Sequence, residues 1–286
     1  MKKLIEFKHD EIENLENEKK QLLIDKKEEK EGENDNLSLE IKSEEKEVIK
    51  GTVIVSLLKE INLKVKKGEL IGIIGEIGSG KTCLFNAILN NLDILNNELN
   101  KKIIVNGKIS YSPQKSWILN DTVRNNIIFH NKFDEQKYNK IVDICQLEPD
   151  FELFKSGDLT QLSDKGNNLS GGQKSRINIA RAVYTNADIY LFDDPFSALD
   201  VYVGKNIFEK VMKDYLKGKT ILLITHTLQF IPMMDYVIHM KKGRINYYGR
   251  AKDIINQAFF HMHYIQDDKN KKKKKMRKMN QMHLVG

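Results

Sequence analysis

A glycine-rich octet between a buried strand and a helix constrains the fold of this 286-residue chain more than any other feature. The octet Gly-Glu-Ile-Gly-Ser-Gly-Lys-Thr occupies residues 75–82, directly after the apolar run 70–74 and at the start of a helix predicted over 80–90. Glycines let backbone N–H groups wrap around phosphate oxygens, and the positive end of the helix dipole attracts the same anion. A glycine-rich turn that binds nothing is the alternative, but the strand and the helix are the context that a phosphate loop requires.

Two side chains of the octet suit a nucleotide and its metal ion. Lys81 reaches the β- and γ-phosphate oxygens, and the Thr82 hydroxyl is a potential ligand of Mg²⁺. The octet alone indicates a nucleotide and leaves kinases, GTPases and motor ATPases open. The residues expected to contact the nucleotide here are Gly75, Glu76, Ile77, Gly78, Ser79, Gly80, Lys81, Thr82 and Cys83.

Strand-length apolar runs predict an α/β core. The runs 70–74, 189–192 and 220–224 are separated by helical stretches, an alternation typical of a parallel sheet. Polar, helix-prone sequence extends over 122–184, and a short helix is expected after Arg250.

Shorter signals predict further strands. Alternating apolar and polar residues indicate half-buried strands at 52–56 and 61–65. A Lys-Gly turn at 242–243 joins two more strand-like stretches, and an Asn-Gly pair at 106–107 between apolar residues indicates a type I′ hairpin.

The strand 189–192 ends in two carboxylates, Asp193 and Asp194. This placement lets Asp193 hold the water shell of Mg²⁺ and lets Asp194 face an attacking water. For this motif taken alone, the alternative interpretation is that the two acids only cap the end of a strand.

The pentapeptide Leu-Ser-Gly-Gly-Gln at 169–173 is a second glycine-rich turn, and the helical stretch 174–183 follows it. Its first turn provides a second anion-binding helix N-terminus in the same chain. With this motif the sequence resembles the ATP-binding cassette (ABC) family, in which the pentapeptide is the signature that completes the ATP site of a facing domain. The resemblance extends over about 57–255, with the motifs in the family's order.

The same resemblance implies roles for further residues. Gln114 in Tyr-Ser-Pro-Gln resembles the Q-loop glutamine, 197–200 resembles the D-loop, and His226 resembles the switch histidine, with an ordinary strand-end histidine as the alternative. The implied catalytic residues are Asp194, His226 and Gln114, and the implied Mg²⁺ ligands are Thr82, Gln114 and Asp193. Outside the phosphate loop the resemblance assigns nucleotide binding to Ser170, Gly171, Gly172, Gln173 and Asp200, of which Ser170, Gly172 and Gln173 contact the γ-phosphate held by the partner.

Longer stretches, at 116–127, 166–174 and 180–195, are similar to the first nucleotide-binding domain of the multidrug-resistance-associated subfamily. The resemblance implies a P-loop NTPase core of ABC type with a mostly parallel sheet, an antiparallel β subdomain and a helical subdomain at about 115–174.

This reading divides the chain into three parts. Residues 1–51 form a charged, largely disordered extension or insertion, with 1–8 as a candidate first strand. A solvated helix is the alternative for the charged segment. The nucleotide-binding domain then covers 52–255, and a basic tail covers 256–286.

Two positions depart from the family's pattern. Most hydrolysing cassettes have Glu where this chain has Asp194, and one methylene fewer retracts the carboxylate by about 1.5 Å, so we expect slow hydrolysis. The family also stacks the adenine on an aromatic residue before the first core strands, and this chain has none between Phe7 and Phe85. Phe7 can stack on the adenine only if the charged segment after it loops out as an insertion, which the length of that segment permits.

The net charge of +7 is concentrated in the tail. Of 47 Lys and Arg residues, eight lie between 269 and 278, which leaves 39 basic against 40 acidic residues elsewhere. A neutral body argues against a nucleic-acid footprint, whereas the basic tail suits an anionic membrane surface. The longest apolar runs are far shorter than the roughly 18 to 20 residues of a membrane span. The first residues of the sequence lack the apolar stretch of a secretory signal, and with two cysteines in the chain we expect a reducing compartment.

The resemblance implies an ATPase domain that powers or gates export by a multidrug-resistance-associated transporter, at the cytoplasmic face of a membrane. Its expected partners are ATP, a second nucleotide-binding domain in a head-to-tail pair, and transmembrane domains that contact the region from Gln114 to Trp117. A buried core position is the alternative for Trp117. Asp194 also fits a catalytically idle regulatory module, and a soluble cassette ATPase that acts on nucleic acid is a further alternative.

Overall fold

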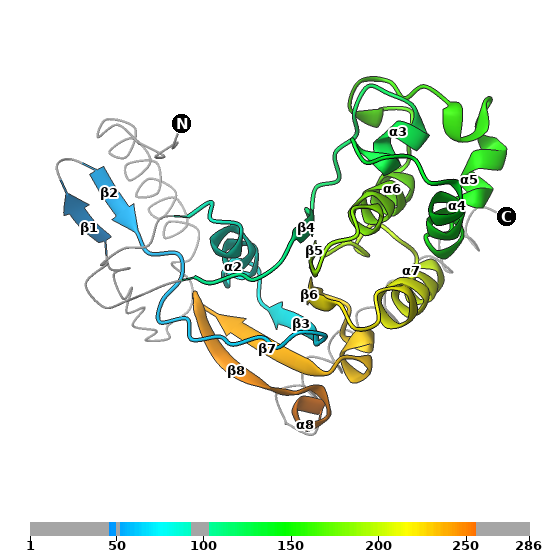
Figure 1. Ribbon diagram of the computed structural model, residues 1–286. Coiled ribbons are helices and arrows are strands. Elements are labelled where there is room, and N and C mark those ends of the chain that lie inside the picture. The colour runs from blue at the N-terminus through cyan, green and yellow to red at the C-terminus, as the bar shows by residue number, and fades with distance from the viewer. Residues whose placement is uncertain (1–45, 50–51, 93–102, 256–286) are drawn as a thin grey trace, which may run out of the picture. The chain divides into compact units, whose positions relative to one another are not determined.

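The computed structural model of the chain describes residues 46–49, 52–92 and 103–255, and the chain divides into two compact units between Lys59 and Glu60. The smaller unit contains an antiparallel strand pair, β1 (Lys46–Ile49) and β2 (Thr52–Val55) (Figure 1). The strand predicted over 52–56 is confirmed.

Strand β1 lies inside the segment 1–51, for which we expect little regular structure. Its last two residues, Val48 and Ile49, are β-branched and favour strands despite the charged residues around them. The rest of the predicted extension, 1–45, with its candidate first strand, and the predicted tail, 256–286, lie outside the described residues.

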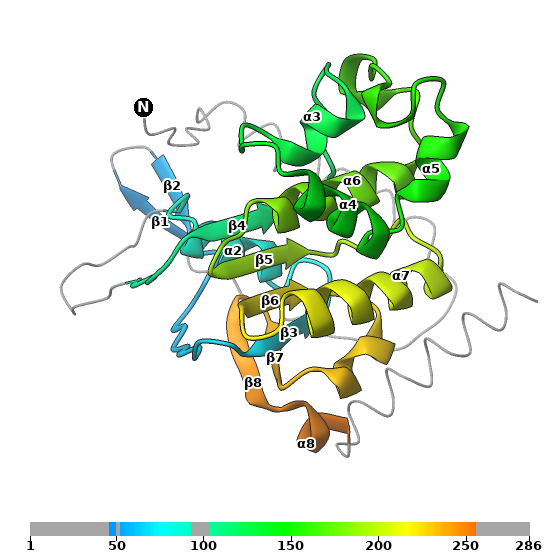
Figure 2. The same ribbon diagram turned by 45° about the vertical axis from the view of Figure 1, so that its right-hand side comes forward.

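The larger unit is built on a six-stranded sheet with the order β4-β5-β6-β3-β7-β8, which Figure 2 shows from top to bottom. Neighbouring strands are parallel except for β8, which is antiparallel to β7. The predicted α/β fold with a mostly parallel sheet is therefore confirmed. The strands are β3 (Leu70–Gly75), β4 (Ile109–Ser112), β5 (Ile189–Asp193), β6 (Thr220–Ile224), β7 (Tyr236–Lys241) and β8 (Arg244–Arg250).

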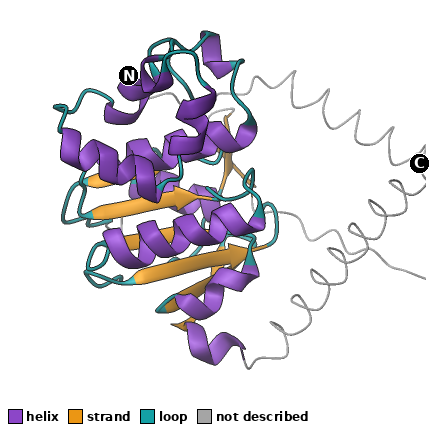
Figure 3. Cartoon of the chain, turned by 90° about the vertical axis from the view of Figure 1, so that its right-hand side faces the viewer, coloured by secondary structure: helices purple, strands orange, loops and turns teal. Residues whose placement is uncertain are grey.

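Helices lie against this sheet and beyond one end of it (Figures 1 and 3). Helices α3 to α6 gather into one group, in which α3 and α4 contact α6, and they confirm the prediction of helical sequence over 122–184. The α-helices are α2 (Lys81–Ile88), α3 (Val123–Ile128), α4 (Glu135–Ile144), α5 (Glu148–Leu153), α6 (Gly171–Tyr184), α7 (Val201–Ile207) and α8 (Ala251–Ile255). Short 3₁₀ segments η2 (Gly157–Leu159), η3 (Asp164–Gly166) and η5 (Leu228–Met233) and a π-helical segment η4 (Phe208–Tyr215) complete the fold.

The core surrounds the central strands. Every residue of β6, and every residue of β3 before Gly75, is buried, as expected for parallel strands covered on both faces. The ring of Phe208, the first residue of η4, stacks on that of Phe230 in η5 with centroids 4.7 Å apart, and Phe196 packs on Phe230 at 5.1 Å.

The parallel arrangement decides where the predicted motifs meet. Because β4, β5, β6 and β3 all run the same way, the segments that follow them leave the same edge of the sheet. Gln114 follows β4, Asp194 follows β5, His226 follows β6 and the glycine-rich octet follows β3. This edge therefore carries the phosphate loop and the polar residues predicted around it.

Two local predictions are wrong. The Asn-Gly pair at 106–107 makes no hairpin, because residue 107 instead brings the chain against Asp188, whose carboxylate accepts a hydrogen bond from the backbone N–H of Lys108 at 2.9 Å. A Cβ atom on Gly107 would lie 2.9 Å from that of Asp188, so glycine is required for this approach. The stretch 61–65 is not a strand. Side chains of β8 contact this segment instead of a backbone ladder: Arg244 pairs with the preceding Glu60, and the Tyr248 hydroxyl donates a hydrogen bond to the Lys64 carbonyl.

Candidate functional site

The phosphate loop connects β3 directly to α2. Gly75, Gly78 and Gly80 have φ values of 149°, 78° and 99°, which L side chains rarely adopt. A Cβ atom on Gly75 would lie 2.3 Å from the Met240 carbonyl oxygen, so only glycine fits where the loop leaves the sheet. The turn between β7 and β8 supports the loop as well, because the N–H of Gly243 donates to the Ser79 carbonyl at 3.0 Å.

Lys81 folds its ammonium group back across this loop. The Nζ atom donates to the carbonyl oxygens of Gly75 and Glu76, both at 2.8 Å. Burial lowers the pKa of Lys81, and the carboxylates of Asp193 and Asp194 act in the opposite direction. The cation is therefore held close to the surface where an anionic ligand would lie.

The loop fits a phosphate group. The hydroxyl oxygen of Ser79 is buried and, among the described residues, has no hydrogen-bond partner, which is the state expected of a donor reserved for a ligand. Nothing lies within 4 Å of the position of a Cβ atom on Gly78, so the side of the loop at this residue is open.

Thr82 and Asp193 form the second half of this site. The Thr82 hydroxyl donates to Oδ2 of Asp193 at 2.8 Å, and Asp193 is buried at the end of β5. Burial raises the pKa of Asp193, while the Thr82 hydrogen bond lowers it. A hydroxyl and a carboxylate are the hard oxygen ligands that Mg²⁺ prefers, so these two residues fit the ion. The exposed Gln114 makes no hydrogen bond to either of them in the described part of the chain.

Asp194 has a strained backbone and a buried side chain. Its φ is 47°, its N–H donates to the Ile224 carbonyl at 2.9 Å, and its own carbonyl accepts from the Ser197 hydroxyl at 2.9 Å. The carboxylate lies 3.5 Å from the backbone nitrogen of the exposed His226. Burial raises the pKa of Asp194, and the charge of His226 opposes the effect. The structure thus brings together Asp194 and His226, two of the three residues to which the resemblance assigns a catalytic role.

The pentapeptide 169–173 begins α6 with a complete capping box. The Ser170 hydroxyl accepts from the N–H of Gln173 at 3.2 Å, and Oε1 of Gln173 accepts from the N–H of Ser170 at 2.8 Å. Gly171 and Gly172 lie beside Ala198, with the position of a Cβ atom on Gly172 3.4 Å from the Ala198 carbonyl.

The predicted residues fall into two groups. Asp200 caps α7 by accepting hydrogen bonds from the N–H groups of Tyr202 and Val203, both at 3.0 Å. Within the described ranges, no hydrogen bond connects Asp200 or residues 170–173 to the phosphate loop 75–82. The phosphate loop with Asp193, Asp194 and His226 forms one group, and the signature turn with 198–200 forms the other.

Trp117 is not a core residue. Its side chain packs between two groups, with the Arg181 guanidinium 3.7 Å from the ring centroid and the Phe129 ring at 5.2 Å, and the residue keeps 38% of its surface exposed. The carbonyl of Trp117 also accepts a hydrogen bond from Arg181 at 2.9 Å.

Three residues near the two groups were missed by sequence reasoning. Arg181 is buried, which lowers its pKa to about 10, and it bonds two oxygens of Asn126. Burial raises the pKa of Tyr111 on β4 to about 12, with a smaller contribution from Asp193. Asp150 contacts Gln173 across the helical group. The hydrogen-bond partner of Arg181 lies 55 residues away and that of Asp150 lies 23 residues away, so no local pattern could have identified these contacts.

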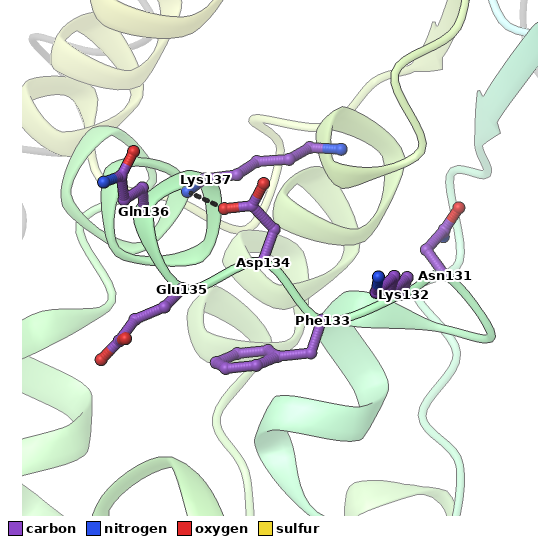
Figure 4. Close-up of a pocket in the computed structure, with 7 residues that line it drawn as sticks. All are labelled: Asn131, Lys132, Phe133, Asp134, Glu135, Gln136 and Lys137. Carbon is purple, nitrogen blue, oxygen red and sulfur yellow. Dashed lines mark hydrogen bonds between the residues drawn. The ribbon is translucent and has the colours of Figure 1, made fainter.

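A surface pocket at the start of α4 is unrelated to this site. Residues 131–137 line it, and within it Asp134 accepts a hydrogen bond from the N–H of Lys137 at 3.0 Å (Figure 4). None of the predicted site residues lies in that pocket. The candidate site is instead the open carboxyl edge of the sheet.

Comparison with known proteins agrees with this geometry. Residues 58–197 match the family model described as ABC transporter. The chain is 45% identical over 200 residues to ABC transporter C family member 9 of Arabidopsis thaliana and 41% identical over 202 residues to ATP-binding cassette sub-family C member 2 of Mus musculus. It is 43% identical over 199 residues to ABC transporter C family member 3 of Dictyostelium discoideum.

These alignments cover most of this chain but little of the relatives. Each covers 70% of the chain and 13% or 14% of the relative. In the ranges that the structure describes, no helix has the length and apolarity needed to cross a bilayer.

Proposed function

Residues 58–197 of this chain belong to the ABC transporter family, whose domains bind ATP, and we propose that the chain is one nucleotide-binding half of a subfamily C transporter. In this role it binds ATP with Mg²⁺ and powers or gates export by membrane domains. The observation that carries the proposal is the joining of the phosphate loop to the acid at the end of β5, through the 2.8 Å contact between Thr82 and Asp193.

The phosphate chain would lie on the loop. Backbone N–H groups of 78–82 and the Ser79 hydroxyl would donate to phosphate oxygens, and the Lys81 ammonium would exchange the two loop carbonyls for the β- and γ-phosphates. Thr82 and Asp193, with Gln114, would hold Mg²⁺, which when bound neutralises charge on the phosphates. Because an anion gives the Lys81 cation a stronger partner than neutral carbonyls, the exchange is favourable.

Hydrolysis at this site would be slow. Asp194 is the residue that would accept a proton from the attacking water, with His226 beside the γ-phosphate. The aspartate side chain is one methylene shorter than the glutamate common in the family, so its carboxylate stays about 1.5 Å farther back. Its carboxylate also lies beside the backbone nitrogen of His226.

The second group of residues would serve a partner. The start of α6 is exposed at Ser170 and Gly171 and half-buried at Gly172 and Gln173, and Asp200 lies next to it through the packing of Gly172 on Ala198. In a head-to-tail pair this surface would cover the γ-phosphate bound by the other domain. The separation of the two groups in one chain supports this arrangement, because each chain then supplies half of two sites.

Membrane domains would contact the chain near Gln114 and Trp117. Both side chains are exposed, and Trp117 offers an aromatic surface that is already ordered by Arg181 and Phe129. The chain would thus be associated with the cytoplasmic face of a membrane through its partners.

A regulatory role is the second candidate. Asp194 favours it, since a site that binds ATP but hydrolyses it slowly can hold the pair closed while the other site turns over. The third candidate, an ATPase that acts on nucleic acid, has less support, because two of the relatives reported above are named as ABC transporters.

ATP binding can be tested on the chain itself. Lys81→Ala should weaken binding of Mg²⁺-ATP, measured by calorimetry, at least a hundredfold, because one cation is removed from the phosphates. Lys137→Ala is the matched control, since the Lys137 ammonium also donates to a backbone carbonyl, that of Tyr184. Equal affinity of the Lys81→Ala and wild-type chains would contradict the proposal.

A further inference from the structure

A buried carboxylate lies beneath the first turn of α6. Asp150 on α5 is 5% exposed, and its two oxygens accept hydrogen bonds from the Arg176 guanidinium at 2.7 to 3.0 Å. Oδ1 also accepts from Nε2 of Gln173 at 3.2 Å. Arg176 thus balances the buried charge, and the same carboxylate touches the last residue of the signature pentapeptide.

The contact with Asp150 determines which way the Gln173 carboxamide points. An ionised carboxylate only accepts hydrogen bonds, so it selects the orientation in which Nε2 faces Asp150. Oε1 must then face the opposite way, where it accepts the N–H of Ser170 at 2.8 Å. If the carboxamide were reversed, two oxygens would face each other at Asp150 and two N–H groups would face each other at Ser170.

We propose that Asp150, held in place by Arg176, is a positioning residue for the signature turn 170–173. By orienting Gln173 it fixes the Ser170 backbone, and with it the hydroxyl at the start of α6, in the direction that faces a partner domain. The inference rests on the proposed function, in which this turn contacts ATP bound by that partner. Asp150 itself would touch neither the nucleotide nor the reacting atoms.

The helical group contains a matched control. Asp158 is bonded by the Arg124 guanidinium at 2.7 and 3.1 Å, so it forms the same kind of pair as Asp150 and Arg176. Neither Asp158 nor Arg124 has a hydrogen bond to residues 170–173 in the described part of the chain. A comparison of variants at Asp158 and Asp150 therefore separates the effect of losing an aspartate–arginine pair from the effect of losing the contact with Gln173.

The positioning is tested by amide hydrogen exchange on the 286-residue chain, followed by NMR. Asp150→Asn should accelerate exchange at the Ser170 N–H about tenfold, because the asparagine amide no longer enforces one orientation of Gln173. Asp158→Asn should leave Ser170 exchange unchanged. Unchanged exchange in both variants would overturn the positioning role.

A second variant covers the case in which Asp150→Asn does not fold. Arg176→Lys keeps a cation beside Asp150 but loses the two-pronged hydrogen bonds that hold the carboxylate under Gln173, so it should also accelerate Ser170 exchange, about threefold. Wild-type exchange at Ser170 in this variant would overturn the proposal equally. The affinity of the chain's own phosphate loop for Mg²⁺-ATP should stay unchanged in each variant.

The functional consequence is tested in the assembled pair of domains. Asp150→Asn should lower kcat for ATP hydrolysis about tenfold with an unchanged ATP affinity at the chain's own loop, whereas Asp158→Asn should not. Faster Ser170 exchange without a change in turnover would overturn the role of the signature turn in the proposed function and would support Asp150 as its positioning residue. Slower turnover with unchanged Ser170 exchange would overturn the inference about Asp150.

Discussion

Thr82 and Asp193, which lie 111 residues apart in the chain, are joined by a hydrogen bond of 2.8 Å between a helix start and a strand end. The bond connects the phosphate loop to the carboxyl end of β5. It also opposes the rise in the pKa of Asp193 that burial causes. This contact is therefore both a stability element and the candidate metal site.

Thr82→Val should destabilise the fold by about 2 kcal/mol, because the buried Asp193 carboxylate loses the donor that stabilises its charge. Urea unfolding at pH 7 measures the change. Thr82→Ser keeps the hydroxyl and should retain most of the stability. Equal stability of the Val variant and the wild type would show that the hydrogen bond contributes nothing.

Asp194→Asn should stabilise the chain by about 1 kcal/mol at pH 7, since burial disfavours the charge at this position and asparagine tolerates the same positive φ. The folded-state pKa of Asp194 is raised above its ordinary value of 3.8, so the cost of the charge is present above the folded pKa and is lost as the pH falls through it. The gain in the free energy of unfolding from Asp194→Asn should therefore shrink as the pH falls through the folded-state pKa of Asp194. Asp200→Asn, at an exposed cap that asparagine also fills, should show neither effect.

Asp194→Glu should raise the rate of a single ATP turnover about tenfold or more, because the added methylene brings the carboxylate to the attacking water. Glutamate tolerates a φ of 47° less well than aspartate, so the faster variant should be about 1 kcal/mol less stable. Rapid-quench assays of both chains give the comparison. A wild type that already turns over as fast as the variant would contradict the idea of a degenerate site.

Gly75→Ala and Gly78→Ala should differ sharply. The new Cβ atom at residue 75 would lie 2.3 Å from the Met240 carbonyl oxygen, which we expect to cost about 3 kcal/mol and to abolish nucleotide binding. At residue 78 nothing lies within 4 Å, so only the positive φ is strained, at about 1 kcal/mol. Thermal unfolding and ATP calorimetry on the two variants check the order.

The sheet was predictable because its central strands are buried on both faces. Such strands appear as unbroken apolar runs, as in Leu70–Gly75 and Thr220–Ile224, and the glycine, acid or histidine that follows each run marks its carboxyl end. The hairpin predicted at the Asn-Gly pair 106–107 was wrong, because a glycine that allows close approach to Asp188 cannot be distinguished by sequence from a glycine in a hairpin turn.

The site was predictable only where its chemistry is local. The loop 75–82 and the signature 169–173 are contiguous, so their residue types and spacing suffice to identify them. The contact of Asp150 with Gln173 and the support of Ser79 by Gly243 depend on tertiary packing. Single-sequence patterns carry no information on such pairs.

Arg181 gives α6 a mechanical property. The guanidinium holds the backbone and ring of Trp117, and about 16 Å of rigid helix, at about 1.5 Å per residue, separate it from Ser170 at the other end. A displacement of the segment around Trp117 would therefore be transmitted through α6 to the signature turn at its other end. The contact with Trp117 and the signature turn therefore lie at the two ends of one helix, and a tilt of α6 about its middle would move both.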